Sequence, residues 1–71
     1  FREGVLSVDY AQNLVVIKTM PGLANGAAAA LDGMEVPYLV GSLAGDDTVL
    51  LVLRDNAAAA EFADEIKEML R

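Results

Sequence analysis

Two adjacent aspartates, Asp46 and Asp47, offer the clearest chemistry in this sequence. They follow Gly45 in the stretch GSLAGDDTVLLVL and lie between two largely apolar segments. Neighbouring carboxylates repel each other, so either a turn requires both side chains or a cation is bound by them. The pair therefore predicts a tight turn or a cation site.

Three interpretations fit the Gly-Asp-Asp sequence. Glycine permits a left-handed backbone and aspartate hydrogen-bonds its own turn, so a purely structural role is the ordinary one. Paired aspartates on a hairpin also resemble the magnesium-binding loop of RNA-dependent RNA polymerases. That site needs a further carboxylate strand and a nucleotide channel, which a chain of 71 residues does not supply. The third interpretation is an organic cation, because a guanidinium presents a planar fork of donors that carboxylates match with paired hydrogen bonds.

Groups for catalysis are scarce. The chain has no histidine and no cysteine, which excludes an imidazole base, a thiol nucleophile, disulfide bonds and the common zinc sites. Ser7, Ser42, Thr19 and Thr48 lack an obvious activating partner, and Lys18 is expected to be solvated at a strand end. We therefore expect neither an enzyme nor a bound cofactor or metal.

Length and charge narrow the function further. A length of 71 residues predicts one domain, residues 1–71. The chain starts with Phe1 rather than with a methionine, so we expect it to be a fragment of a longer protein. Eleven acidic residues against five basic ones, a net charge of −6, argue against direct contact with nucleic acid and favour a cationic ligand or basic partner. No signal peptide or membrane-spanning run is present, and the lack of cysteine fits a cytoplasmic protein.

Hydrophobic patterning predicts six elements in the order ββαββα. Two hairpins make the sheet mainly antiparallel, so we expect an α+β sandwich of two layers, with four strands and two helices on one face. The expected strands are Val5–Asp9, Leu14–Thr19, Tyr38–Leu43 and Thr48–Leu53. The expected helices lie within Pro21–Met34, ending at Gly33, and from about Ala57 to Leu70 with Asp55 or Asn56 as the cap.

Helical spacing predicts which side chains of each helix are buried. For the first helix the expected core stripe is Leu23, Ala27, Leu31 and Met34. Its opposite face is expected to consist of Gly22, Asn25, Ala28, Ala29 and Asp32. For the last helix the expected stripe is Phe62, Ile66, Met69 and Leu70.

The central strands predict self-association. Two helices cover only one face of a four-stranded sheet, and the other face should then be polar. The segments LVVI and VLLVL are instead apolar on both faces. A small domain without disulfides or metal commonly gains stability by self-association, so we expect a second copy of the chain to cover the open face.

Two motifs at a fixed separation carry a family resemblance. TMPGLAN, from Thr19 to Asn25, precedes Asp32 and then GSLAGDDT, from Gly41 to Thr48. Together they resemble the C-terminal domain of the bacterial arginine repressor over nearly the whole chain. The resemblance implies trimers that stack in pairs into a hexamer, L-arginine as corepressor at the trimer–trimer interface, and operator DNA bound by an N-terminal winged-helix domain that is absent from this fragment.

The resemblance also implies roles for individual residues. Asp46 and Asp47 would hold the charged groups of arginine, with Asp46 pairing with the guanidinium across the interface. Asp32 and Asn25 would lie near the amino-acid end of the ligand, and Ala44 and Gly45 would line the site with backbone.

One departure from the family affects Asn25, where the family commonly has glutamine. Asparagine is one methylene shorter, so water replaces its direct contact or the contact is lost. The alternative function is a ligand-independent oligomerisation domain whose Gly-Asp-Asp is only a turn. A similar ββαββα order occurs in pterin carbinolamine dehydratases, but those enzymes rely on histidines.

Overall fold

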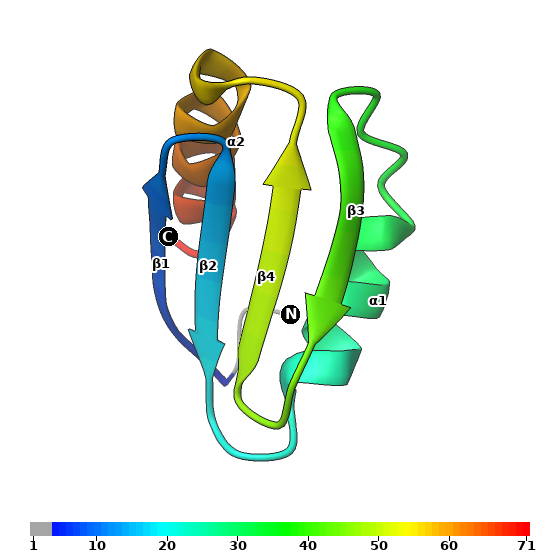
Figure 1. The fold of residues 1–71 in the computed structure, drawn as a ribbon. Helices are drawn as coiled ribbons and strands as arrows, with labels where there is room; N and C mark the ends of the chain where they lie inside the picture. The colour runs from blue at the N-terminus through cyan, green and yellow to red at the C-terminus, as the bar shows by residue number, and fades with distance from the viewer. Residues whose placement is uncertain (1–3) are drawn as a thin grey trace.

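The computed structural model describes residues 4–71, which form four strands and two helices in the predicted ββαββα order. Figure 1 shows the strands side by side, with the β1–β2 and β3–β4 turns at opposite ends of the sheet. The elements are β1 (Val5–Ala11), β2 (Leu14–Thr19), α1 (Ala24–Asp32), β3 (Leu39–Ala44), β4 (Thr48–Leu53) and α2 (Asn56–Met69). Bounds of β2 and β4 agree with the prediction; β1 continues to Ala11, and β3 is shifted by one residue.

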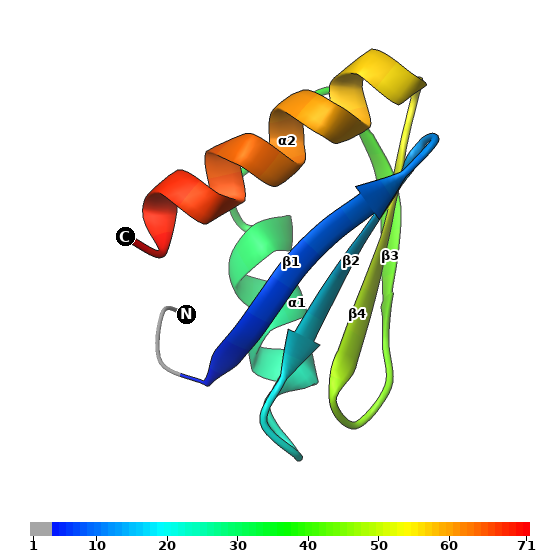
Figure 2. The same ribbon diagram turned by 90° about the vertical axis from the view of Figure 1, so that its left-hand side faces the viewer.

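The sheet is open and antiparallel throughout, with the strand order β1-β2-β4-β3. Both helices cover the same face of it (Figure 2), α2 mainly over β1 and β2 and α1 over β3 and β4. The predicted α+β class, with two layers, is therefore confirmed. Among residues 4–71, no helix has the length and apolar character needed to cross a bilayer.

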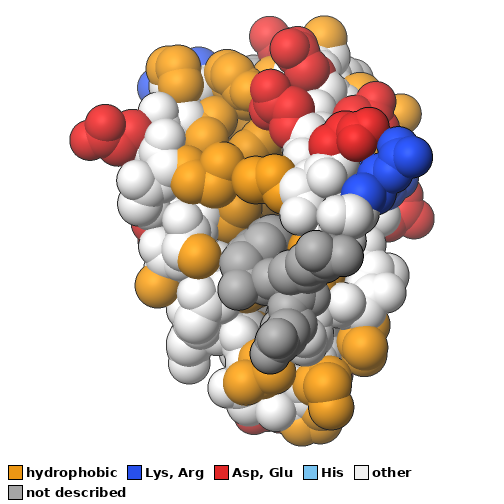
Figure 3. Space-filling view, turned by 180° about the vertical axis from the view of Figure 1, so that it is seen from behind, with side chains coloured by type: hydrophobic (Ala, Val, Ile, Leu, Met, Phe, Trp, Pro, Cys, Tyr) orange, Lys and Arg blue, Asp and Glu red, His pale blue; other side chains and the backbone are white. Residues whose placement is uncertain are grey.

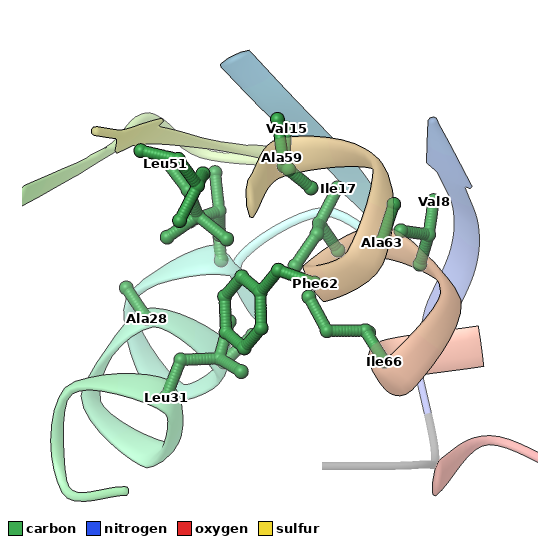
Figure 4. Packing of buried hydrophobic residues seen from close by; sticks show 14 residues of the cluster. Val8, Val15, Ile17, Ala28, Leu31, Leu51, Ala59, Phe62, Ala63 and Ile66 are labelled. Atoms are coloured by element: carbon green, nitrogen blue, oxygen red, sulfur yellow. The ribbon is translucent and has the colours of Figure 1, made fainter. Parts of the chain in front are cut away.

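The core lies between the helices and the sheet. Phe62 of α2 points toward Leu31 of α1 (Figure 4), so side chains from the two helices meet above the strands. The buried apolar residues are Val8, Val15, Ile17, Ala24, Ala27, Ala28, Leu31, Val49, Leu51, Leu53, Ala59, Phe62, Ala63 and Ile66.

The predicted core stripe of α1 is wrong at both ends. Leu23 and Met34 are exposed, at 46% and 45%, because the helix begins only after Leu23 and ends before Gly33. Gly22 has a φ of +84°, which places it in a turn rather than in the first helical turn. Ala28, predicted to face outward, is buried, with only 8% of its surface exposed.

The observed stripe of α1 follows helical spacing with a different phase. Its buried residues are Ala24, Ala27, Ala28 and Leu31. These positions are i, i+3, i+4 and i+7, as one face of a helix requires. Asn25, Ala29 and Asp32 are exposed as predicted, and so is Gly22 in the preceding turn.

Helix α2 agrees with its prediction at Phe62 and Ile66 but not at its end. Met69 is 41% exposed, and Leu70 is a half-buried residue at the C-cap. The buried stripe is completed instead by Ala59 and Ala63. Ala59 lies one turn before Ala63, and Ala63 lies one turn before Ile66. The predicted cap is confirmed as Asp55, whose Oδ1 accepts a hydrogen bond from the backbone N–H of Ala58 at 2.7 Å.

The face of the sheet opposite the helices is apolar at its centre. Val16 of β2 pairs with Leu50 of β4, which pairs in turn with Leu43 of β3. Leu14 and Val52 form the neighbouring row. We call these five residues the open sheet face; Leu43 is 73% exposed and the other four are half-buried. The prediction of an apolar second face is confirmed, and its covering by another copy stays a prediction.

Candidate functional site

The Gly-Asp-Asp turn lies at one end of the sheet, beside the connection from β2 to α1. Figure 1 shows both loops together at the lower end of the view. The hairpin is closed by the backbone N–H of Gly45, which donates to the carbonyl of Thr48 at 2.8 Å. Ala44 is half-buried as the last residue of β3, and Gly45 is exposed.

Backbone hydrogen bonds tie this turn to the start of α1. The carbonyl of Asp47 accepts from the N–H of Thr19 at 2.7 Å. The carbonyl of Asp46 accepts from the N–H groups of Gly22 at 3.1 Å and Ala24 at 3.4 Å. The first N–H groups of a helix lack intrahelical partners, and α1 has no side-chain cap. The backbone carbonyl of Asp46 therefore acts as the acceptor for the N–H group of Ala24, the first residue of α1. The two motifs of the sequence are therefore joined directly.

The side chains of the two aspartates have different surroundings. Asp47 Oδ1 accepts a hydrogen bond from the hydroxyl of Thr48 at 3.0 Å. The same hydroxyl accepts from Lys18 Nζ at 2.7 Å. Within residues 4–71, the exposed carboxylate of Asp46 has no hydrogen-bond partner or ion pair. Asp46 is thus the carboxylate that is free to bind a cation.

The two α1 residues predicted for the site lie at opposite ends of the helix. Asn25 follows Ala24 directly and is exposed in the first turn, close to the backbone of Asp46. Asp32 is seven residues further on, which corresponds to about 10 Å along a helix. Its Oδ1 accepts from Ser42 Oγ of β3 at 3.1 Å. The structure therefore brings Asn25 to the Gly-Asp-Asp turn and leaves Asp32 apart from it.

Two residues near the turn, Lys18 and Thr48, were not predicted as site residues. Lys18 was expected to be solvated at a strand end, and it is exposed. Its hydrogen bond follows from the register of β2 and β4, which places Lys18 opposite Thr48. Only the apolar pattern of these strands was readable from sequence, and this pattern does not specify the register between non-consecutive strands.

On the face of the molecule that the helices cover, the charged side chains are distributed unevenly between the two helices (Figure 3). Acidic side chains gather over α2, whereas the surface over α1 carries few charged groups, as its sequence ANGAAAALD requires. Near the start of α1, Met20 and Leu23 are 50% and 46% exposed. The surface beside the Gly-Asp-Asp turn is thus made mainly of small and apolar groups.

Acidic side chains are not closely clustered in the part of the chain that the structure describes. Among residues 4–71, no three acidic, histidine or cysteine side chains are grouped closely enough to hold an ion. A pair of carboxylates suffices for an organic cation, because a guanidinium brings five N–H donors of its own.

A perturbed side chain lies at the other end of the sheet. Tyr38 precedes β3, and its hydroxyl donates to Glu65 of α2 at 2.8 Å. This hydrogen bond raises the pKa of Tyr38 to about 12, since ionisation would both break the bond and place a second negative charge beside Glu65. The ring of Tyr38 packs edge-on against Phe62 at 6.0 Å between centroids, so the contact fastens α2 to the start of β3.

Comparison with known proteins gives consistent matches across the chain. The family model described as arginine repressor, C-terminal domain, matches residues 1–68. A protein of Acetivibrio thermocellus named arginine repressor is 48% identical over 71 residues, which are 100% of this chain and 46% of that protein. Another of the same name from Symbiobacterium thermophilum is 48% identical over 71 residues, 100% of this chain and 47% of that protein.

A third arginine repressor, from Caldicellulosiruptor saccharolyticus, is 46% identical over 70 residues, 99% of this chain and 46% of that protein. The chain thus spans about half the length of the curated relatives it matches. The names describe repressors rather than enzymes, in agreement with the prediction that this chain is not an enzyme.

Proposed function

Because this chain belongs to the family of the arginine repressor C-terminal domain, we propose that residues 1–71 form a domain that binds L-arginine and couples this binding to self-assembly. The observation that carries the proposal is the Gly-Asp-Asp turn. Its backbone is fixed to the start of α1, while the carboxylate of Asp46 remains free. A rigid turn with an unpaired carboxylate is suited to bind a cation without first reorganising.

In the proposed site, Asp46 pairs with the guanidinium of arginine through two parallel hydrogen bonds. Asp47 adds a second negative charge, and the backbone of Ala44 and Gly45 lines the site beside it. Asn25 lies close enough to the turn to contact the amino-acid end of the ligand, directly or through water. Asp32, about 10 Å further along α1, reaches the ligand only from another subunit.

Self-assembly is supported by the apolar surfaces that the chain leaves exposed. The row formed by Val16, Leu50 and Leu43 crosses three strands of the open sheet face, with Leu43 73% exposed. A chain of 71 residues buries a limited core of its own, so covering this row adds stability. We propose trimers as the unit of assembly, and a stack of two trimers as the arginine-bound state.

Binding and assembly are then thermodynamically linked. In the stacked state, aspartates from neighbouring subunits lie near one another and repel when the site is empty. Arginine supplies the missing positive charge, so it binds the stacked state more tightly than the separate trimers. A ligand that prefers one state shifts the equilibrium toward that state.

For the whole protein, we propose a cytoplasmic transcriptional regulator of arginine metabolism, with L-arginine as its corepressor. Operator DNA would be bound by a winged-helix domain in the part of the protein outside this chain. The net charge of −6 supports the assignment of DNA binding to another domain, because DNA binding needs a positive surface. The chain itself then contributes the ligand response and the symmetry of the assembly.

A second candidate is an oligomerisation domain that does not respond to a ligand. The structural role of the Asp46 and Asp47 carbonyls favours it, since both residues fix the turn whether or not arginine is bound. Calorimetric titration of the 71-residue chain with L-arginine separates the two functions. Saturable heat with L-arginine, and none with L-lysine or L-citrulline, is expected; no heat with L-arginine and no increase in thermal stability would favour the second candidate.

A further inference from the structure

The Gly-Asp-Asp turn has a positive charge of its own close by. Lys18 Nζ donates to the hydroxyl of Thr48, and this hydroxyl donates its proton to Asp47 Oδ1. A hydroxyl has one proton and two lone pairs, so Thr48 makes both bonds at once. The result is a chain of two hydrogen bonds, 2.7 and 3.0 Å long, from an ammonium to a carboxylate.

This chain makes the two aspartates unequal. Lys18 and Asp47 do not form a direct ion pair; among residues 4–71, the close ion pair is Arg71 with Glu68 on α2. Their charges are nevertheless within about 6 Å of each other, less than the Debye length of ~8 Å at physiological salt. The Asp47 carboxylate is therefore held in one orientation, and Lys18 offsets part of its negative charge. The negative charge of Asp46 is not offset by a hydrogen-bonded partner within residues 4–71.

We propose that Lys18 is a resident counter-cation of the arginine site and, with Thr48 as the positioning residue between it and Asp47, sets how strongly assembly depends on arginine. The inference rests on the proposed function of the turn. In the empty assembly, Lys18 offsets part of the repulsion between carboxylates of neighbouring subunits. It thereby stabilises the assembly without ligand and reduces the additional stabilisation that arginine provides.

Removing this charge has an effect of definite sign. Lys18 alternates with Val16 along β2 and so lies on the open sheet face, where an apolar substitute would itself favour self-association. A Lys18→Gln variant keeps a long polar side chain but leaves Asp47 without its counter-cation. Assembly without arginine then weakens, and the gain in assembly on adding arginine increases. Exposed charge interactions are individually small, so we expect the gain to increase about two- to fivefold per site.

The experiment measures the self-association constant by sedimentation equilibrium, without and with saturating L-arginine, and takes the ratio of the two as the arginine gain. Lys67→Gln on α2 makes the same change of net charge at an exposed position away from the turn and serves as the matched control. Lys18→Arg keeps the positive charge and is expected to restore the gain of the parent chain. Thr48→Ala breaks the hydrogen-bond chain with little added apolar surface and is expected to shift the gain in the direction of Lys18→Gln.

High salt gives an independent check. In about 0.5 M salt, the difference between Lys18→Gln and the parent chain is expected to shrink, since screening weakens charge interactions over this distance. A packing role of the lysine side chain would leave the difference unchanged.

Three outcomes overturn the inference. One is a gain in Lys18→Gln equal to that of the parent chain and of Lys67→Gln. Another is an equal increase in Lys18→Arg, since charge would then not be the cause. In both cases the proposed function stands if the parent chain assembles in response to arginine. The third is a parent chain without any arginine gain, which overturns the proposed function and this inference together.

Discussion

Replacing Asp46 by asparagine removes one negative charge from the Gly-Asp-Asp turn and leaves its structural contacts in place. The hydrogen bonds from the N–H groups of Gly22 and Ala24 end on the backbone carbonyl of Asp46, which asparagine also has. The Asp46 side chain is exposed and makes no hydrogen bond within residues 4–71. We therefore expect the free energy of unfolding to change by less than about 0.5 kcal/mol.

The same substitution is expected to weaken the binding of arginine. Taking one partner from a hydrogen-bonded charge pair at an interface typically costs ~2–5 kcal/mol. Because the Asp46 side chain is exposed in the single chain, we take the low end, about 2 kcal/mol, which corresponds to roughly a 30-fold loss of arginine affinity. Calorimetric titration gives the affinity, and denaturant unfolding of the same sample gives the stability.

Asp64→Asn is the matched control for this experiment. Asp64 is an exposed aspartate on α2, so the substitution makes the same change of net charge away from the turn. It is expected to bind arginine as the parent chain does. If Asp46→Asn assembled normally and bound arginine with the affinity of the parent chain, the assignment of this carboxylate would be refuted.

Three further predictions follow from other contacts. Asp55→Ala is expected to lower the free energy of unfolding by about 1 kcal/mol in denaturant titrations, because the N–H of Ala58 loses its capping acceptor. The pKa of Tyr38 is raised from 10.0 to about 12 by its hydrogen bond to Glu65. The stability that this bond contributes is therefore complete below pH 10 and is lost as the pH rises toward 12, a loss that Tyr38→Phe abolishes in unfolding curves measured against pH. Leu43→Glu, at a side chain 73% exposed on the open sheet face, is expected to weaken self-association measured by sedimentation without unfolding the chain.

Each of these predictions has a result that contradicts it. Unchanged stability in Asp55→Ala would mean that the cap contributes nothing. An equal loss of stability above pH 10 with and without the Tyr38 hydroxyl would assign the loss to other groups. Unimpaired assembly of Leu43→Glu would mean that β3 lies outside the subunit interface.

The strands were more predictable than the first helix for a physical reason. Branched apolar residues distinguish β2 and β4 sharply from the polar turns beside them, and both strands begin and end where expected. Helix α1 consists largely of alanine, which gives little contrast between its faces. Its phase is set instead by tertiary contact, and the turn at Gly22 delays its start to Ala24.

The candidate site was proposed from a pair of motifs, whose arrangement of atoms the sequence did not specify. Asp46 and Asp47 stand next to each other in the sequence, so their proximity was evident without a structure. Lys18 and Thr48 are 30 residues apart and meet only through the register of β2 and β4. The two partners of the Asp46 carbonyl likewise depend on how the β2–α1 connection folds back over the turn.

In the proposed function, arginine binding and assembly are coupled through the Gly-Asp-Asp turn. This coupling can be measured by sedimentation of the 71-residue chain with and without millimolar L-arginine, with L-lysine as control. We expect the mass to increase from about three chains to about six with L-arginine and not to increase with L-lysine. A mass that stays at one or three chains, with no thermal stabilisation by L-arginine, would contradict it.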